Sequence, residues 1–388
     1  MSNKKLIANI LIIFLITRGI FAAVYFIYCA VCNDNSGFEA VFGRWDTEHY
    51  SDIIENGYHY TNKSNGQANW AFFPLFPLAC RGVRMISGGN LSPFWCGIIV
   101  SNVCLVIAAF FAVKLIRDRG IVKGERGVLF TGLSKNGSLL AWFLMLGPFT
   151  VYFSAVYTES LFVLLLVLFF YAAQKELFPL AGMFAALAGA TRSVGVLLII
   201  PLIMAMYSSY RKEKGSGNIF CFVGNVFARP ARLFSLLLVP VGLFCYMLYL
   251  YFFLGDAFGF IHVQVAWRNE DFLPVIGVLK HYLFSTGEIH YTISAWICIA
   301  AFVLYVWMFV KGLRREAVWG IISLLLPLTS HIMSTPRFIS GSFVVWMGMY
   351  LLIKSMKSHG AQVFFTLLLY AGGVATIALW YAQAHIIM

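Results

Sequence analysis

The sequence predicts an all-α polytopic membrane protein, a bundle of about eleven transmembrane helices. The chain of 388 residues is 61% hydrophobic and only 11% charged, and its mean hydropathy is +0.82. A soluble domain of this length could not bury so much apolar surface, so lipid must be part of its solvent. The apolar runs continue for roughly 15 to 25 residues without the alternation that barrel strands show, which indicates helices.

The first element is an apolar run from Leu6 to about Val31, which follows Lys4 and Lys5. This run is longer than the roughly 7–15-residue core of a cleaved signal peptide, and no small-x-small cleavage site ends it. We therefore expect a retained first helix. Polar breaks separate the later spans, at about 33–91, 116–136, 151–158, 174–177, 190–194, 210–232, 255–290, 311–317, 330–338 and 354–361.

The distribution of charges indicates that successive polar breaks lie on alternate sides of the membrane. With the N-terminus in the cytoplasm, the cytoplasmic segments hold most of the Lys and Arg, and the outer segments hold most of the Asp and Glu. This bias is what the positive-inside rule predicts. The net charge of +12 therefore reflects topology and contact with anionic membrane lipids, and it indicates no nucleic-acid partner.

Two outer segments are large, 33–91 and 255–290, but neither is long enough to fold as an independent domain. A single membrane domain over 1–388 is therefore predicted. In the cytoplasmic break at 210–232, the stretch from Phe220 to Arg232 is expected to lie on the membrane surface. Cys29 and Cys32 form a C-x-x-C, yet no second Cys or His pair at ligand spacing supports it, so neither a metal nor another cofactor is predicted.

The first outer loop contains a predicted amphipathic helix. Asp46 or Thr47 can cap its start, and Asn56-Gly57 is a good stop signal. Its acidic residues and its apolar residues occupy different faces, Glu48, Asp52 and Glu55 on one and Tyr50, Ile53 and Ile54 on the other. We expect this helix to lie at the bilayer surface, next to the end of the first span.

Asp46 is the leading candidate for chemistry. A carboxylate where the chain leaves the membrane can deprotonate an acceptor hydroxyl while a lipid-linked donor approaches from the bilayer. Capping of the following helix is an equally physical explanation of the same residue. Asp46 and Glu48 also make an Asp-x-Glu, which could bind a divalent metal, although a solvated helix face is the simpler interpretation of Glu48.

Three more charged residues fall at predicted outer helix ends. Glu159 lies at the membrane edge, where an ionised group is costly unless it is used, and Ser154 or Thr158 is expected to cap the helix that follows. Arg192 and Arg337 suit a phosphate or pyrophosphate headgroup, because a guanidinium stays charged and presents a planar fork of donors. The alternative for both is snorkelling to the interface or pairing with a carboxylate such as Glu159.

These residues lie in blocks that resemble the PIG-V family of GPI mannosyltransferase II, particularly its shorter bacterial members. The blocks span about residues 43 to 340 in the family's order: Arg44-Trp45-Asp46 with Tyr50, Ile53 and Gly57-Tyr58, then Ala71-Phe72-Phe73-Pro74 with Pro77, Tyr157-Thr158-Glu159-Ser160-Leu161-Phe162, Thr191-Arg192-Ser193 with Gly195, and Pro336-Arg337-Phe338. Two departures leave points open. Thr47-Glu48-His49 replace the usual shorter residues, so Glu48 or His49 could share a role, and Ser193 stands where Pro is common, so the turn at Arg192 can differ.

The resemblance implies a GT-C glycosyltransferase that takes a sugar, typically mannose, from a polyprenyl phosphate with inversion, and it implies Asp46 as the catalytic base. The acceptor would be a glycolipid or glycan on the outer face of a bacterial plasma membrane, or of the endoplasmic reticulum membrane in a eukaryote. Arg192 and Arg337 would stabilise the leaving phosphate, so no metal is needed. The substrate-binding residues expected around the base are Arg44, Trp45, Glu48, His49, Tyr157, Glu159, Arg192 and Arg337.

A different class of protein, a transporter or flippase of a lipid-linked sugar or polymer, would also need outer carboxylates and intramembrane arginines. It should show inverted repeats or broken midplane helices with charges along the path. Here the candidate charges cluster on one predicted face, which favours a one-sided enzyme. A scaffold subunit with a degenerate site is disfavoured because Asp46, Glu159, Arg192 and Arg337 are all intact.

Overall fold

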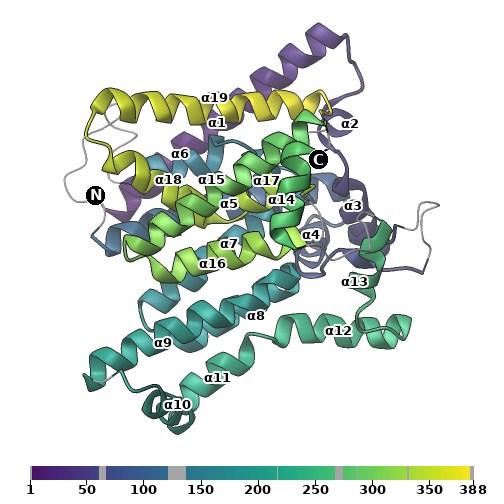
Figure 1. Cartoon of the computed structure of the whole chain (residues 1–388). Helices are drawn as coiled ribbons and strands as arrows, with labels where there is room; N and C mark the ends of the chain where they lie inside the picture. The colour runs from purple at the N-terminus through teal and green to yellow at the C-terminus, as the bar shows by residue number, and fades with distance from the viewer. Residues whose placement is uncertain are drawn as a thin grey trace.

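The computed structural model describes residues 2–60, 67–120, 137–215, 217–266, 274–285, 287–329 and 332–384, and the regular secondary structure in these ranges is helical throughout (Figure 1). This confirms the predicted all-α class. The α-helices are α1 (Asn3–Cys32), α2 (Phe38–Phe42), α3 (Asp46–Asn56), α4 (Leu75–Ile86), α5 (Pro93–Asp118), α6 (Ser138–Leu146), α7 (Glu159–Gln174), α8 (Phe178–Thr191), α9 (Ile199–Lys214), α10 (Ile219–Ala228), α11 (Pro230–Leu238), α12 (Val241–Leu254), α13 (Gly259–His262), α14 (Val275–Phe284), α15 (Ile289–Val310), α16 (Arg314–Leu325), α17 (Thr335–Ser340), α18 (Phe343–Ser355) and α19 (His359–Tyr381). Short 3-10 helices are η1 (Asn69–Ala71), η2 (Thr150–Phe153), η3 (Ser193–Leu198), η4 (Val263–Ala266) and η5 (Pro327–Thr329).

Several helices have the length and composition of membrane spans. Within the described residues, five segments are long and apolar enough to cross a bilayer, namely α1, α5, Ser193–Lys214, α15 and α19. The helices α10 and α11 form a further apolar pair, bent by 91°. Shorter apolar helices are α7, α8, α12, α14 and α18. The prediction of a polytopic helical bundle is confirmed.

The predicted spans differ from the helices in three places. The run after residue 136 ends early, because Gly147 and Pro148 follow α6 and a proline disfavours helix in the residue before it. The run before residue 255 is divided between α11 and α12 beside Pro240. The apolar helix α14 lies inside the break predicted at 255–290, but its ten residues extend about 15 Å and cannot cross a membrane.

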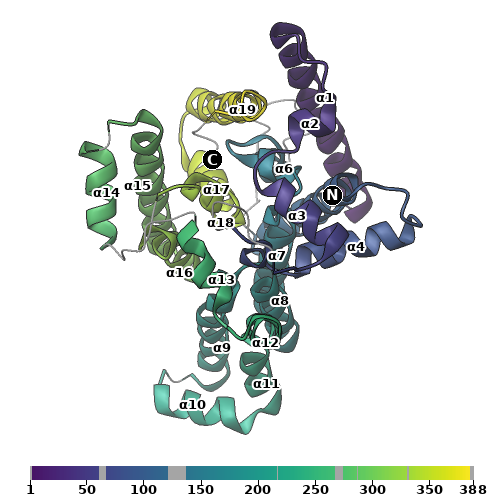
Figure 2. The same ribbon diagram turned by 90° about the vertical axis from the view of Figure 1, so that its right-hand side faces the viewer.

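The helix α7 lies near the centre of the molecule and is buried along almost its whole length, as its uniformly apolar sequence requires. Viewed along the bundle in Figure 2, α1 and α19 lie on one side of α7, α14 and α15 on a second, and α8 to α12 on a third. Outer helices turn large apolar side chains outward, for example Leu15 on α1, which is 68% exposed. Such a surface is stable only against lipid.

The first outer loop folds into α2, α3, η1 and α4 against the end of the bundle. The predicted helix at 46–56 is present, with Tyr50, Ile53 and Ile54 buried. It stops at Gly57, whose φ of 81° is readily available to glycine. The helix α4 was not predicted. Its Arg81 Nε donates to the Ile54 carbonyl over 2.8 Å, which satisfies a group left free at the end of α3.

The polar breaks predicted for the cytoplasmic side and those predicted for the outer side lie at opposite ends of the bundle. Breaks predicted for the cytoplasmic side meet where Lys175 pairs with Asp118 at 2.7 Å and Arg119 pairs with Glu316 at 2.5 Å. In Figure 1 this is the end that carries the N-terminus, whereas α3 and α13, from predicted outer breaks, lie at the right-hand end. The structure therefore agrees with the predicted alternation. On the N-terminal side, α10 also turns Phe220 and Phe227 outward, as expected of a helix on the membrane surface.

Candidate active site

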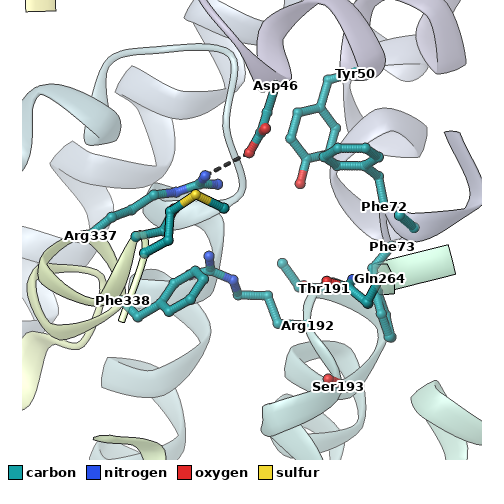
Figure 3. Close-up of a pocket in the computed structure, with 13 residues that line it drawn as sticks. Asp46, Tyr50, Phe72, Phe73, Thr191, Arg192, Ser193, Gln264, Arg337 and Phe338 are labelled. Atoms are coloured by element: carbon teal, nitrogen blue, oxygen red, sulfur yellow. Dashed lines mark hydrogen bonds and ion pairs between the residues drawn. The ribbon is translucent and has the colours of Figure 1, made fainter. Parts of the chain in front are cut away.

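Four charged side chains from distant parts of the sequence meet at the end of the bundle that carries α3. They are Asp46 at the start of α3, Glu159 at the start of α7, Arg192 directly after α8, and Arg337 in α17. Arg337 Nη1 lies 2.6 Å from Asp46 Oδ2 (Figure 3), and Arg337 Nε lies 2.5 Å from Glu159 Oε1. Arg192 Nη2 lies 3.1 Å from the same Glu159 oxygen. The result is a continuous network of two cations and two anions.

Exposure differs along this network. The side chain of Glu159 is fully buried, that of Arg337 is 10% exposed, that of Arg192 is 16% exposed and that of Asp46 is 23% exposed. The second oxygen of Glu159, Oε2, is buried and accepts no hydrogen bond. Of the two carboxylates, Asp46 is therefore the one that a substrate can reach. Glu159 contacts the two arginines from the buried side of the network.

Arg337 is held in a charged state by its surroundings. Burial alone would lower the pKa of Arg337, but the carboxylates of Glu159 and Asp46 outweigh it and raise that pKa well above its usual value. Its guanidinium carbon also lies 4.4 Å from the centre of the Tyr157 ring and 5.2 Å from that of Tyr152. These contacts favour a fixed cation.

Asp46 does not cap α3. The capping position belongs to Trp45, and neither a Trp45 nor an Asp46 side chain makes a capping hydrogen bond there. Thr47 does not act as a cap either, since its Oγ1 is buried without a hydrogen bond. The capping explanation of Asp46 and Thr47 is therefore wrong, because the hydroxyl of Tyr157 from another segment takes the first free N–H of the helix.

The caps predicted for α7 are also absent. Thr158 precedes the helix, but its Oγ1 is buried and has no hydrogen-bond partner. The Ser154 hydroxyl instead donates to the side chain of Asn102. The start of α7 carries Glu159 in its first turn, where a negative charge is favoured by the helix dipole.

Two cavities open beside the charged network. One of about 220 Å³ extends toward Arg192, between α3, η1 and the end of α8 (Figure 3). The other, of about 420 Å³, extends past Trp45 toward Tyr152 and Tyr157. Asp46 and Arg337 line both cavities, together with Met333 and Ser334. A partly exposed carboxylate and a buried cation thus stand in the wall that the two cavities share.

Comparison with known proteins relates the same residues to a family. The family described as mannosyltransferase (PIG-V) matches residues 31–213, which include Asp46, Glu159 and Arg192. Residues 31–213 thus resemble the PIG-V family. The chain is 28% identical to GPI alpha-1,6-mannosyltransferase 2 of Cricetulus griseus over 172 residues, which are 44% of this chain and 33% of that protein.

Other relatives are similar to the chain over a comparable part of its length. The chain is 31% identical to GPI alpha-1,6-mannosyltransferase 2 of Homo sapiens over 123 residues, 31% of this chain and 23% of the relative. It is 30% identical to GPI mannosyltransferase 2 of Cryptococcus neoformans var. neoformans over 165 residues, 41% of this chain and 36% of the relative. The chain thus spans about a third of the length of the first relatives it matches. Arg337 lies outside the matched family region, and the structure brings it to the site.

The remaining predicted site residues lie in different places. Trp45, Glu48, His49 and Tyr157 line the 420 Å³ cavity. Arg44 is not among the residues that line either cavity. With the Gln383 amide oriented so that its oxygen accepts, Arg44 Nη1 and Nη2 donate to it over 2.8 and 3.0 Å, so Arg44 ties the first outer loop to the chain after α19.

Sequence reasoning missed several lining residues. Tyr50, Phe72, Phe73, Gln264, Met333 and Ser334 face the 220 Å³ cavity. Tyr50, Phe72 and Phe73 belong to blocks already noted, and Ser334 lies two residues before another. Gln264 carries no signal, because a single polar residue in an outer loop is unremarkable until the loop is placed. Across the described ranges, no group of three or more His, Cys, Asp or Glu residues is arranged to hold a metal ion.

Proposed function

We propose that this chain is an inverting mannosyltransferase, which moves a sugar from a polyprenyl phosphate to a hydroxyl of a glycolipid or glycan. The observation that carries the proposal is the shared wall of the two cavities, where Asp46 and Arg337 both reach each cavity. Transfer between two substrates requires a base next to the acceptor and a cation next to the leaving phosphate, at one meeting point. The names of the relatives support mannose as the sugar.

The reaction follows from this arrangement. Asp46 takes the proton of the acceptor hydroxyl as the hydroxyl oxygen bonds to the anomeric carbon of the donor sugar. The bond from that carbon to the phosphate oxygen breaks, and the oxygen leaves with the electron pair. Because attack comes from the face opposite the phosphate, the configuration at the carbon inverts, as in other single displacements at sugars.

Arg192 and Arg337 act on the leaving phosphate in this proposal. The donor phosphodiester carries one negative charge, and the departing monoester gains a second, so nearby cations stabilise the transition state more than the bound donor. Of the two cavities, Arg192 lines the one of 220 Å³ and not the other, which supports binding of the phosphate on that side. The acceptor sugar then occupies the 420 Å³ cavity, beside Trp45, Glu48 and His49.

The ion pair between Asp46 and Arg337 fits the same scheme. The Asp46 carboxylate is in direct contact with the Arg337 guanidinium at 2.6 Å, so a donor phosphate that binds Arg337 would compete with Asp46 for it. Glu159 Oε1, 2.5 Å from Arg337 Nε, keeps the guanidinium in place during this exchange. In this scheme, donor binding frees the Asp46 carboxylate to contact the acceptor hydroxyl.

The transporter alternative finds less support. A lipid-linked sugar would need polar groups along a path between the two ends of the bundle. The central helix α7 is apolar from Leu161 to Phe170, and the ion pairs at its ends belong to separate clusters. We favour a one-sided enzyme, formed by a single membrane domain over 1–388, with a cytoplasmic N-terminus and the site on the outer face of a bacterial plasma membrane, or of the endoplasmic reticulum membrane in a eukaryote.

The test is transfer of radiolabelled mannose from polyprenyl-phosphate-mannose in membranes that hold wild type, Asp46→Asn or Glu55→Gln. Asp46→Asn keeps the shape but removes the base, so transfer should fall by about 100-fold or more. Glu55→Gln changes a half-exposed carboxylate of the same helix and should keep wild-type activity. Equal transfer by wild type and Asp46→Asn would exclude Asp46 as the base, and Glu48→Gln would then be the variant to measure.

A further inference from the structure

The backbone at Trp45 adopts a conformation that this residue type rarely takes. Its φ is 48° and its ψ is −110°. Residues 44–47 form a tight turn, in which the Thr47 N–H donates to the Arg44 carbonyl over 3.1 Å. These dihedral angles are those of the first central residue of a type II′ turn, a position usually held by glycine. A tryptophan persists there only when its surroundings hold it.

The hydroxyl of Tyr157 holds both sides of this turn. It accepts a hydrogen bond from the Asp46 N–H over 3.1 Å and donates one to the Arg44 carbonyl over 3.0 Å. Tyr157 is 1% exposed, so both bonds are protected from water. One phenol group thus bridges the peptide units before and after Trp45.

Tyr157 is itself fixed by neighbouring elements. The Ser101 hydroxyl of α5 donates to the Ala155 carbonyl over 2.7 Å and lies 3.4 Å from the Tyr157 carbonyl. The Tyr157 ring packs edge-on against Trp380, with ring centres 5.7 Å apart. Trp380 also contacts the Trp45 ring at 4.8 Å. We call the Tyr157 hydroxyl with its two hydrogen bonds to the turn the clamp. The clamp is supported by α5 and α19, which are long helices of the bundle.

This arrangement decides where the Asp46 carboxylate points. In many helices the side chain at the start satisfies a free N–H, which would turn a carboxylate back onto its own backbone. Here Tyr157 supplies that bond to the Asp46 N–H. The carboxylate is left to face Arg337 and the two cavities.

We infer that Tyr157 is a positioning residue, which caps α3 from another segment and holds the Trp45 turn so that Asp46 faces both cavities. Its expected effect on catalysis rests on the proposed function, whereas its effect on the backbone does not. The inference changes the role expected for Tyr157 from contact with substrate to control of the base.

Tyr157→Phe is the direct test, because it removes the hydroxyl and leaves the ring on Arg337 and Trp380. Hydrogen exchange, followed by mass spectrometry on a peptide that covers residues 44–50, should become faster in purified Tyr157→Phe than in wild type. Tyr305→Phe is the matched control, since Tyr305 is equally buried, on α15, and makes no contact with the turn. Exchange of the 44–50 peptide should be unchanged in this control. Equal exchange in Tyr157→Phe and Tyr305→Phe would refute the clamp.

Kinetics with polyprenyl-phosphate-mannose provide the second readout. A misdirected base should lower kcat by about tenfold or more and leave KM for donor and acceptor within about twofold. A raised KM with unchanged kcat would instead mean that the hydroxyl binds substrate, and it would overturn the inference. If wild type transfers no mannose, the proposed function fails, and the exchange comparison still decides on the clamp.

A double-mutant cycle covers the case in which Tyr157→Phe folds poorly. Trp45→Gly places at the turn the residue that tolerates its dihedral angles, so the hydroxyl should be needed less. In the Trp45→Gly background, Tyr157→Phe should accelerate exchange of the 44–50 peptide clearly less than it does in the wild-type background. If Tyr157→Phe alone cannot be purified, its acceleration in the Trp45→Gly background should stay below about twofold. An undiminished acceleration would show that the hydroxyl does not act through the turn.

Discussion

At the scale of single residues, the site depends on one oxygen atom of Glu159, which accepts hydrogen bonds from both arginines. Glu159→Gln keeps the size of the side chain but removes its charge, so that a neutral amide replaces the carboxylate beside the two guanidinium groups. Removing one partner of a buried ion pair costs about 3–5 kcal/mol, so we expect a marked loss of stability. Thermal unfolding in detergent measures this loss.

Glu55→Gln is the control for that measurement. Glu55 also pairs with an arginine, Arg84, at 3.3 Å, but its side chain is 53% exposed. A pair of this kind contributes about 0–1 kcal/mol, so the melting temperature should hardly change. Equal melting temperatures of the two variants would mean that Glu159 does not hold the arginines.

The sequence was sufficient to select Glu159, Arg192 and Arg337, because each charge falls at the edge of an apolar run, where it must be used or paired. Asp46 was selected by its place at the start of the helix predicted in the first outer loop. Pairing of Arg192 or Arg337 with Glu159 was among the predicted alternatives. The role of Tyr157 could not be predicted. Its two hydrogen bonds go to backbone atoms 111 and 113 residues away, and backbone atoms leave no pattern in a sequence.

At the scale of elements, the stability of α3 depends on the backbone conformation of Gly57, where the helix ends. The backbone of Gly57 has a φ of 81° and a ψ of −166°, a region that essentially only glycine populates. Gly57→Ala should therefore destabilise the protein by about 1–3 kcal/mol through backbone strain alone. The added methyl group would have room, since the nearest side-chain atom, Arg81 Nη2, is 3.5 Å away. The measurement is again the melting temperature.

Gly82→Ala makes the same chemical change in the middle of the neighbouring helix α4. A Cβ there meets nothing within 4 Å. Alanine is the better helix former, so this variant should be more stable by up to about 1 kcal/mol. Opposite signs for the two glycines would support the strain argument, whereas similar losses would contradict it.

Elements were predictable where local chemistry dominates. The capping candidates and Asn56-Gly57 located α3 to within a residue, although the predicted cap does not act. The helix α4 was missed because it lies inside a polar break, although Phe76 and Cys80 on one of its faces are buried. The early end of α6 at Gly147-Pro148 shows the opposite case. The apolar sequence continues there, but the proline prevents the backbone from continuing as a helix.

At the scale of the whole molecule, the alternation of sides makes a prediction that needs no assay of activity. The helices α1 and α19 pack together, and the end of α19 lies against the second half of α1, where the Tyr381 hydroxyl donates to the Phe21 carbonyl over 3.4 Å and the Tyr381 ring stacks on Tyr28. They therefore run in the same direction. In Figure 1 the N-terminus and the C-terminus lie toward opposite ends of the bundle. A chain with this arrangement crosses the membrane an odd number of times.

Epitope tags at the two ends of the chain would show this parity in sealed membrane vesicles of known sidedness. With the N-terminus in the cytoplasm, as the Lys and Arg distribution predicts, an added protease should remove the C-terminal tag from the outer face and spare the N-terminal tag. Detergent should expose both tags to the protease. Removal or protection of both tags in intact vesicles would contradict the odd number of crossings. Removal of only the N-terminal tag would keep the parity but reverse the orientation, and Asp46 and Arg337 would then face the cytoplasm.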